Sequence, residues 1–401
     1  MIEVKSELGA GTRGASLGPD ALKIASLEYG QYFFGKFKRK EIRDTSLLLY
    51  KNPIRTHAKR IRGIVEMFQK LARTINDELK IGTFPVVISG DHSSAGATIA
   101  GVKMAYPDKK IGVIWVDAHA DIHTPFTTPS GNVHGMPVAA SLGIDNLDDA
   151  QNVLADDRTR EYWNNLKNVG GINPKIYPGD LVYIGIRDME EPELNFIRKK
   201  GIKVITVKQV RAADAKDIAK EVRDYLRACE VIYITFDVDS IDSAIIKGTG
   251  TPVPNGFKLS EVSKLLEALC KDPRLACFEI TEINPLLDEN NDTARKVFPI
   301  FKGVVNTIKK RLEEDEKKRK KDEKKAVKVA KTAKKKITTT TGGPALKKAA
   351  KGTKITKKKI ISTLPAALKK AAKAPKTSKK KVVPAAKPLA MKKTTSKSNP
   401  K

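Results

Sequence analysis

The chain of 401 residues has few cysteines, few aromatic residues and no long hydrophobic run. Its three cysteines, Cys229, Cys270 and Cys277, show no Cys-x-x-Cys spacing, which argues against a disulfide framework and favours reduced, buried thiols. No apolar run approaches the ~20 residues of a membrane-spanning helix. The first residues form neither an apolar nor an Arg-rich leader. We therefore expect a cytoplasmic protein without a membrane partner.

Acidic residues are scarce in one part of the chain only. The whole sequence has 76 Lys or Arg, 46 Asp or Glu and a formal net charge of +30. From Lys317 to Lys401, 31 Lys or Arg stand against 2 Asp or Glu, so this tail carries +29 and leaves +1 to residues 1–316. The chain therefore joins a nearly neutral body to a strongly basic tail.

The tail has the composition of a disordered segment. It contains no Phe, Tyr or Trp after residue 314 and is dominated by Lys, Ala, Thr and Pro, so it cannot bury a core. We assign residues 1–313 to a catalytic domain and residues 314–401 to a Lys-rich disordered tail, whose first charged residues can also continue the last helix of the body.

Two interpretations of the tail remain open. It is either a solvated extension without a fixed partner or an arm that binds nucleic acid or another polyanion. Without aromatic residues to stack on bases, such binding would be driven by phosphate contacts and would not depend on sequence.

Apolar stretches with strand character alternate with helical patterns in the body. Strands are expected at 84–88, 111–116, 181–186, 203–207, 231–236 and 277–283, and helices at 61–79, 94–105, 214–229, 259–271 and 292–313. Nearly continuous apolar strands that alternate with helices are typical of a parallel sheet covered on both faces. The fold class is thus α/β, with function expected at the carboxyl ends of the strands.

The apolar stretch 111–116 is followed by an unusual run of polar side chains. Asp117, His119, Asp121 and His123 occupy every second position. On an extended chain alternate residues face the same side, so these groups converge just past a strand. A polar loop with solvated charges is the simpler interpretation, but a divalent cation would relieve the repulsion, and carboxylate with imidazole suits manganese and related metals.

Other strand ends carry matching groups. Asp237 and Asp239 close a second apolar strand, and His92 follows a third. Four of the five histidines in the chain fall in these turns: His92, His119, His123 and His134. Four carboxylates and two imidazoles at one edge of a sheet point to two metals, which together can lower the pKa of a shared water.

Five motifs at these turns resemble the ureohydrolase family and occur in the order of that family. They are Gly-Asp-His-Ser at 90–93, Asp-Ala-His-Ala-Asp at 117–121, Ser-Gly-Asn-Val-His-Gly at 130–135, Asp-Val-Asp at 237–239 and Glu-Ile-Asn-Pro at 282–285. The loop 124–135 most resembles that of arginases. The resemblance implies the three-layer α/β/α, arginase-like fold with a mostly parallel sheet, and a homo-oligomer, either a trimer or a hexamer.

The resemblance also implies a cofactor and a reaction. Two Mn²⁺ per subunit would be held by six residues, with Asp117 and Asp237 bridging: His92, Asp117, His119, Asp121, Asp237 and Asp239. A hydroxide between the metals would attack the guanidinium carbon of L-arginine, giving ornithine and urea. Asp121 would pass a proton to the departing amine, Glu282 would pair with the guanidinium, and His134 would act near the mouth of the site.

The substrate end of the site departs from the arginase pattern. The resemblance places Ser130, Asn132, Glu190 and Thr251 around the amino-acid end of the substrate. His123 stands where arginases usually have an Asn that contacts the substrate carboxylate, and an imidazole can still donate that hydrogen bond. Glu190 replaces a shorter Asp. These departures concern the choice of guanidino substrate and leave the six metal ligands intact.

Three alternatives to an arginase remain. Another ureohydrolase (an agmatinase, guanidinobutyrase or formimidoylglutamase) would use the same metals. A zinc deacetylase of the related fold typically has a tandem His pair, which the sequence lacks. The third alternative is an inactive enzyme whose tail associates with nucleic acid. Loss of a metal ligand would favour this alternative, but all six ligands are present.

Overall fold

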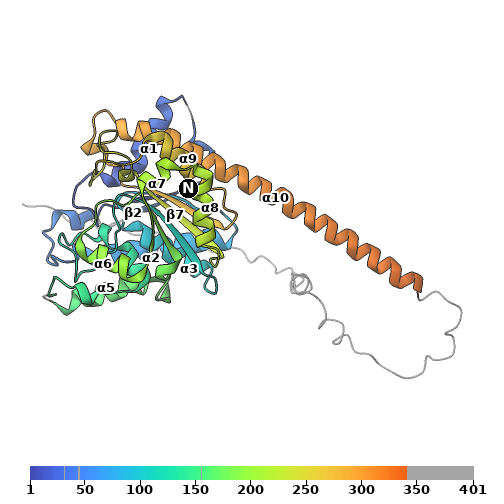
Figure 1. Cartoon of the computed structure of the whole chain (residues 1–401), viewed down its shortest axis with the longest axis horizontal. Coiled ribbons are helices and arrows are strands. Elements are labelled where there is room, and N and C mark those ends of the chain that lie inside the picture. The colour runs from blue at the N-terminus through green and yellow to red at the C-terminus, as the bar shows by residue number, and fades with distance from the viewer. Residues whose placement is uncertain (31, 44–45, 155, 341–401) are drawn as a thin grey trace, which may run out of the picture. The chain divides into compact units, whose positions relative to one another are not determined.

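The computed structural model describes residues 1–30, 32–43, 46–154 and 156–340, without the side chains of 327–340. Its body is built on one sheet of eight strands in the order β2-β1-β3-β8-β7-β4-β5-β6 (Figure 1). All neighbouring strands are parallel, which confirms the expected α/β class. The strands are β1 (Ile2–Lys5), β2 (Lys40–Arg43), β3 (Val86–Ser89), β4 (Ile111–Val116), β5 (Leu181–Ile184), β6 (Lys203–Ile205), β7 (Val231–Asp237) and β8 (Leu275–Thr281).

The central strands are apolar on both faces because each face is covered. In β4, Val113 and Trp115 belong to one hydrophobic core, while Ile114 and Val116 belong to the other. This alternation follows from the period of two along an extended chain. One core lies between the sheet and each of the two layers of helices, so the three-layer arrangement is also confirmed.

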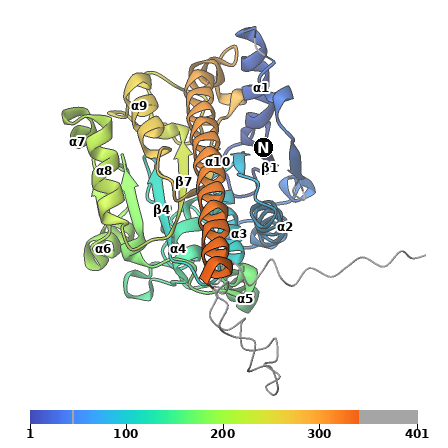
Figure 2. The ribbon, with the colours of Figure 1, turned by 90° about the vertical axis from the view of Figure 1, so that its right-hand side faces the viewer.

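Each helical layer has its own set of helices. One face carries α2 (Ile61–Lys80), α3 (Ser94–Ala105), α4 (Pro137–Leu142), α5 (Asp157–Lys167) and α6 (Glu191–Lys200), with α2 and α3 packed side by side (Figure 1). The other carries α1 (Gly18–Glu28), α7 (Val207–Ala212), α8 (Ala215–Tyr225), α9 (Leu259–Leu269) and the start of α10 (Asp292–Thr340), with α8 beside α9 (Figure 2).

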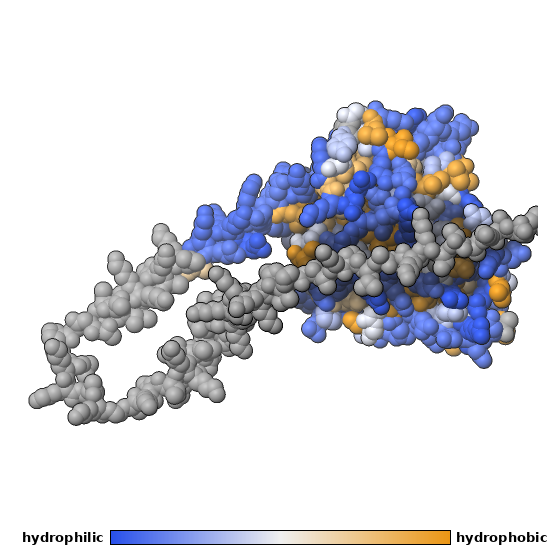
Figure 3. All heavy atoms as spheres, turned by 180° about the vertical axis from the view of Figure 1, so that it is seen from behind, coloured by the Kyte–Doolittle hydropathy of each residue, from blue (hydrophilic) through white to orange (hydrophobic). Residues whose placement is uncertain are grey.

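Helix α10 continues past residue 314, where the expected tail begins. Its buried apolar residues end near Ile308, and residues 312–326 are exposed and form a largely hydrophilic surface (Figure 3). Lys, Arg, Glu and Ala all favour helix, and pairs such as Lys320 with Glu316 (2.7 Å) support it at i,i+4 spacing. Residues 314–340 are thus the charged helical extension. The expected disorder of residues 341–401 lies outside the described residues.

The remaining expectations for the body are met in part. The three cysteines are free and buried. Strands β1 and β2 were not expected from the sequence, and neither were helices α1, α4, α5, α6 and α7. None of the helices in the described parts of the chain has both the length and the apolar character needed to cross a membrane.

Candidate metal centre and substrate cavity

Four adjacent strands bring the sequence motifs together. In the sheet, β3, β8, β7 and β4 are consecutive neighbours. Because the strands are parallel, their carboxyl ends meet at one edge, as expected for sheets of this type. At or just after these ends lie His92, Glu282, Asp237 and Asp117. They are adjacent in space although His92 and Glu282 are 190 positions apart in the sequence.

His92 lies at the centre of this edge. Its Nδ1 atom is 2.9 Å from Asp117 Oδ2, 3.0 Å from Asp121 Oδ2 and 3.1 Å from Asp237 Oδ2. Despite these three short distances, Nδ1 is buried and has no hydrogen-bond partner. A buried nitrogen surrounded by carboxylate oxygens but unpaired with them is the arrangement expected around a cation.

Three groups fix the orientation of the His92 ring. Its Nε2 atom is 2.9 Å from Thr235 Oγ1. The ring stacks on Trp115 with 4.2 Å between centroids, and the backbone N–H of His92 donates to Glu282 Oε1 (2.8 Å). A hydrogen bond from Nε2–H to Thr235 leaves the lone pair of Nδ1 free for a metal, which is the usual support of a ligating imidazole.

A second group of donors lies beside the first. His119 Nδ1 is 3.0 Å from Asp239 Oδ2 and 3.6 Å from Asp117 Oδ1. Trp115 Nε1 donates to Asp117 Oδ2 (2.8 Å), and Thr251 Oγ1 donates to Asp239 Oδ2 (3.0 Å). Asp117 contacts both histidines, as a residue shared between two metals would. We define the inner end of the site as these six residues: His92, Asp117, His119, Asp121, Asp237 and Asp239.

The charges of the inner end are unbalanced without a cation. Burial, and after it the charges of Asp239 and Asp117, raise the pKa of Asp237 well above its usual range. Burial and Asp117 also raise the pKa values of Asp121 and Asp239. No Lys or Arg of the described residues forms an ion pair with these carboxylates. The donor set and the unpaired Nδ1 therefore fit a pair of divalent metals.

Two residues of the site have left-handed backbone conformations. Asp121 has φ 49° and Glu282 has φ 65°. Residues other than glycine rarely adopt this region, and where they do the surrounding structure enforces it, often at functional sites. The backbone at both positions is therefore held against its own preference, which turns each carboxylate toward the centre.

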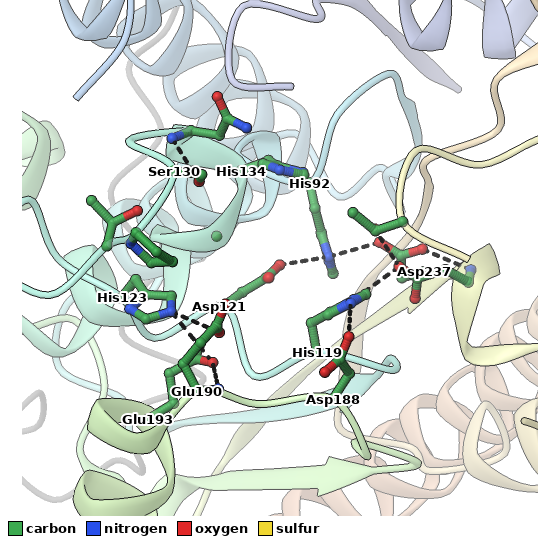
Figure 4. A pocket seen from close by; sticks show the side chains of 16 residues that line it. His92, His119, Asp121, His123, Ser130, His134, Asp188, Glu190, Glu193 and Asp237 are labelled. Carbon is green, nitrogen blue, oxygen red and sulfur yellow. Dashed lines mark hydrogen bonds and ion pairs between the residues drawn. The ribbon is translucent and has the colours of Figure 1, made fainter. Parts of the chain in front are cut away.

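A cavity of about 250 Å³ opens beside the inner end (Figure 4). Among the residues expected at the site, it is lined by His92, His119, Asp121, His123, Ser130, Asn132, His134, Glu190, Asp237, Asp239 and Thr251. Asp117 and Glu282 do not line it. Glu282 is buried behind His134, whose Nδ1 lies 3.2 Å from Glu282 Oε1. Burial opposes a charge on His134, but Glu282 outweighs it and raises the pKa of His134 to about 9.

The N-terminal loop closes the site from behind His134. The backbone N–H of Gly9 donates to Asp91 Oδ2 (3.0 Å), and the N–H of His134 donates to the carbonyl of Gly9 (3.2 Å). A Cβ at Gly9 would lie 2.8 Å from Asp91 Oδ1, so only glycine fits there without a shift. This contact ties the turn after β3 to the loop that carries His134.

One side of the cavity is acidic. Asp188, Glu190 and Glu193 line it, with Asp188 Oδ2 3.7 Å from His119 Nε2 of the inner end, and no Lys or Arg lines the cavity. His123 Nε2 donates to Glu190 Oε2 (2.9 Å) and lies 3.5 Å from Glu193 Oε2, opposite His92 and Asp237 (Figure 4). We define the outer rim as the wall residues His123, Ser130, Asn132, Asp188, Glu190 and Glu193.

Several residues that build the site were not singled out from the sequence. Thr235 and Trp115 contact His92 and Asp117 from inside β7 and β4, and Glu193 lies in the first turn of α6. Thr235 and Trp115 are part of apolar strands, where a single hydroxyl or indole carries no distinct pattern. Asp188 follows the buried strand β5. Its position after a strand was the only feature of the sequence that could have indicated it as a site residue.

Most of the chain is similar to known arginases. The model of the Arginase family matches residues 2–303. An arginase of Bacillus caldovelox is 34% identical over 307 residues, which cover 73% of this chain and 93% of that protein. The crystal structure of arginase from Bacillus subtilis has a TM-score of 0.62 at 31% identity and covers 76% of this chain and 98% of its own.

A further similar structure is that of an arginase with a bound ligand. The arginase of Entamoeba histolytica in complex with L-ornithine has a TM-score of 0.64 at 29% identity, covering 76% of this chain and 97% of its own. The family match ends before the exposed part of α10, so the basic tail is outside it.

Proposed function

Because this chain belongs to the arginase family, we propose that it is a binuclear-manganese hydrolase that cleaves L-arginine to ornithine and urea. One observation carries the proposal. His92 Nδ1 is buried and unpaired among oxygens of Asp117, Asp121 and Asp237, at the wall of a cavity large enough for a small molecule. Such a site suits metal-assisted hydrolysis of a compact substrate.

The six inner-end residues would hold the two metals, with Asp117 and Asp237 shared between them. When bound, the metals supply a water acidic enough to serve as the nucleophile near neutral pH. Asp121 faces the cavity and would carry a proton from that water to the departing amine. Glu282 would stabilise the guanidinium from behind His134, and His134 would transfer protons between the site and solvent.

The outer rim would hold the other end of the substrate. Ser130, Asn132, Glu190 and His123 of the rim line the cavity, as does Thr251, whose hydroxyl donates to Asp239 of the inner end. An amide and a hydroxyl can each donate to a carboxylate, and Glu190 can accept from an ammonium group. The complex of a related arginase with L-ornithine, an amino acid that carries both groups, supports this division of roles.

Release of urea tests the proposal directly. Manganese-loaded protein should produce urea from L-arginine, a chelator should abolish the activity, and added manganese should restore it. Agmatine and 4-guanidinobutyrate serve as alternative substrates in the same assay, and formiminoglutamate, which would give formamide and not urea, is followed by release of glutamate. Turnover of one of these in place of arginine would make the protein another ureohydrolase, and turnover of none would contradict the proposal.

Other parts of the assignment remain predictions. We expect a cytoplasmic protein that assembles into a trimer or hexamer, which the mass in solution would test. We also expect the basic tail to bind nucleic acid or another polyanion without sequence preference. That expectation rests on the charge of residues 317–401 alone.

A further inference from the structure

Glu279 is a buried carboxylate inside the sheet that the proposed mechanism does not use. It lies in β8 and is 0% exposed. Its oxygens accept hydrogen bonds from three hydroxyls, those of Ser89 (2.6 Å), Thr98 (2.6 Å) and Tyr233 (2.8 Å). No Lys or Arg is among the partners that the described residues give it. A buried charge without a cationic partner is costly, so such a group is a candidate for a functional role.

Two hydroxyls connect Glu279 to His92. Thr235 lies opposite Glu279 in the register of β7 and β8, and Tyr233, two residues earlier in β7, lies on the same face of the sheet. The Thr235 hydroxyl is 2.9 Å from His92 Nε2 and also forms a side-chain hydrogen bond with Tyr233. A continuous chain of hydrogen bonds therefore runs from the imidazole through two hydroxyls to the carboxylate. We define the relay as these four residues: His92, Thr235, Tyr233 and Glu279.

The direction of these hydrogen bonds follows from the acceptor at the end of the relay. A carboxylate can only accept, so each hydroxyl bound to it donates its single proton there. Burial, and after it the charge of Glu279, raise the pKa of Tyr233 well above its usual range, so the phenol keeps that proton. Its oxygen is left to accept from Thr235, whose oxygen in turn accepts from Nε2–H of His92. The lone pair of the imidazole then lies on Nδ1, among the carboxylates of the inner end.

The other two hydroxyls reach Glu279 from outside the relay. Ser89 ends β3 and Thr98 lies in α3, and neither is a hydrogen-bond partner of the His92 ring. Thr98 donates to the same oxygen, Oε2, as Tyr233 does. If Glu279 only tied α3 to the sheet, it would depend equally on Thr98 and Tyr233. A role toward the metal centre depends on Tyr233 alone, so the two hydroxyls separate the two explanations.

From this geometry we infer that Glu279 is a positioning residue for the metal centre, which acts through two hydroxyls to fix the proton of His92 on Nε2. Nδ1 is thereby held ready for a divalent metal. The inference rests on the proposed function, because it takes His92 to be a metal ligand. A metal-binding imidazole usually donates its other N–H to a fixed acceptor. Here that acceptor is a hydroxyl, which can donate or accept, and the buried carboxylate at the far end of the relay sets its direction.

Binding of manganese alone tests the inference and needs no turnover. Electron paramagnetic resonance of free Mn²⁺ during a titration gives the binding constants of the two metals. Tyr233→Phe keeps the ring and Glu279 but interrupts the relay. We expect one binding constant to fall about 10-fold, the lower end of what loss of a supporting hydrogen bond costs, and the other to stay within about twofold. Thr98→Val is the matched control, because it also removes one hydroxyl from Glu279 Oε2 and should leave both binding constants unchanged.

Two further variants place the effect on the relay. In the Thr235→Val background the chain of hydrogen bonds is already interrupted next to His92, so adding Tyr233→Phe should not weaken manganese binding further. Glu279→Gln keeps the shape of the side chain but introduces an N–H donor in place of an acceptor. It should weaken the same metal as Tyr233→Phe, by about 10-fold or more.

Each outcome of these titrations decides the inference. Equal losses in Tyr233→Phe and Thr98→Val, or additive losses in the double variant, would make Glu279 a structural residue and overturn it. Unchanged manganese binding by Glu279→Gln would overturn it as well. Wild-type protein that binds two manganese ions but releases no urea from arginine would contradict the proposed function and leave the inference standing. Wild-type protein that binds no manganese would refute both.

Discussion

The inner end and the outer rim of the cavity are built in different ways. The inner-end carboxylates are at most 8% exposed and follow the ends of hydrogen-bonded strands, where backbone N–H groups and Trp115 hold them. In the rim, Ser130, Asp188 and Glu190 are exposed and come from loops and the first turn of α6. The comparison teaches that the proposed metal ligands sit on strand ends, whereas the residues proposed to choose the substrate sit on segments that can change independently.

The largest effect should come from the residue shared between the metals. Asp237→Ala should lose most of the bound metal and lower kcat/KM by about 10³-fold or more, since metal activation supplies several kcal/mol. His92→Ala should lose about one equivalent. Metal counting by mass spectrometry with a urea assay measures both. If Asp237→Ala retained two metals, Asp237 would not be shared between them. The division of the donors into two groups joined by a shared residue would then fail.

Thr235 supports His92 of the inner end from inside strand β7. Thr235→Val keeps the shape but removes the hydroxyl that lies 2.9 Å from His92 Nε2. Loss of such a supporting hydrogen bond typically costs 10–100-fold in metal affinity, so we expect a change in that range at the site of His92. Thr235→Ser is the control, because it keeps the hydroxyl. Equal affinities of the Val and Ser variants would show that the ring is held by packing on Trp115 alone.

The inner end also predicts how stability depends on pH. In the metal-free protein the pKa values of Asp121, Asp237 and Asp239 are raised in the folded state. The folded state then binds more protons than the unfolded state, whose Asp residues titrate at about 3.9, so the free energy of unfolding falls as the pH rises above about 4. The raised pKa values of His92 and His119 act in the same direction, since their stabilisation is lost at higher pH.

Metal binding should reverse this trend, because the ligands bind the metal only when deprotonated. The difference in Tm between manganese-loaded and chelated protein should therefore grow from pH 5 to pH 8, reaching roughly 10 °C at saturating metal. Differential scanning calorimetry at several pH values measures it. A difference that does not change with pH would indicate that the carboxylates are not the metal ligands.

A neutral contact in the rim should matter much less. Asn132 lines the cavity in the outer rim, and Asn132→Ala should raise KM for arginine several-fold, the size of one neutral hydrogen bond of about 1 kcal/mol. The metals and kcat should be unchanged, which steady-state kinetics and metal counting establish together. A loss of metal from this variant would mean that the rim and the inner end are not independent.

The smallest effect on catalysis should come from the basic tail, which contains no site residue. Removal of residues 317–401 deletes a net charge of +29 and should leave kcat/KM within about twofold, because residues 312–326 are exposed and the buried part of α10 ends before them. Binding to duplex DNA should be lost. In the full chain, DNA binding should weaken steeply with salt. The logarithm of the binding constant should fall with the logarithm of the salt concentration, with a slope of about −0.9 per phosphate contact. Fluorescence anisotropy at two salt concentrations tests this, and equal DNA binding by the truncated body would contradict it.

The sequence alone determined six of the eight strands and the residues proposed for the inner end. Continuous apolar runs such as 111–116 are recognisable because a strand buried on both faces admits few polar residues, and β4 has these bounds. The ligands at 117, 119 and 121 are close in sequence, and parallel strands place the ends of β7 and β3 at the same edge. The metal site could therefore be predicted from spacing and periodicity. Helix α10 past residue 314 was less certain, because its charged residues fit either a helix or a disordered chain.

Only the tertiary structure decided how these groups are supported and what the rim can bind. His123 and Glu190 are 67 positions apart, and no periodic pattern connects a loop residue to the cap of a distant helix. The sequence predicts His123 as a group available to a substrate carboxylate, whereas in the fold both ring nitrogens are occupied. Glu282 is likewise a matched motif residue whose place behind His134 depends on its left-handed backbone and on the loop around Gly9. Side-chain chemistry and local spacing follow from sequence, but the partner that satisfies each polar group is chosen by the packing of segments far apart in the chain.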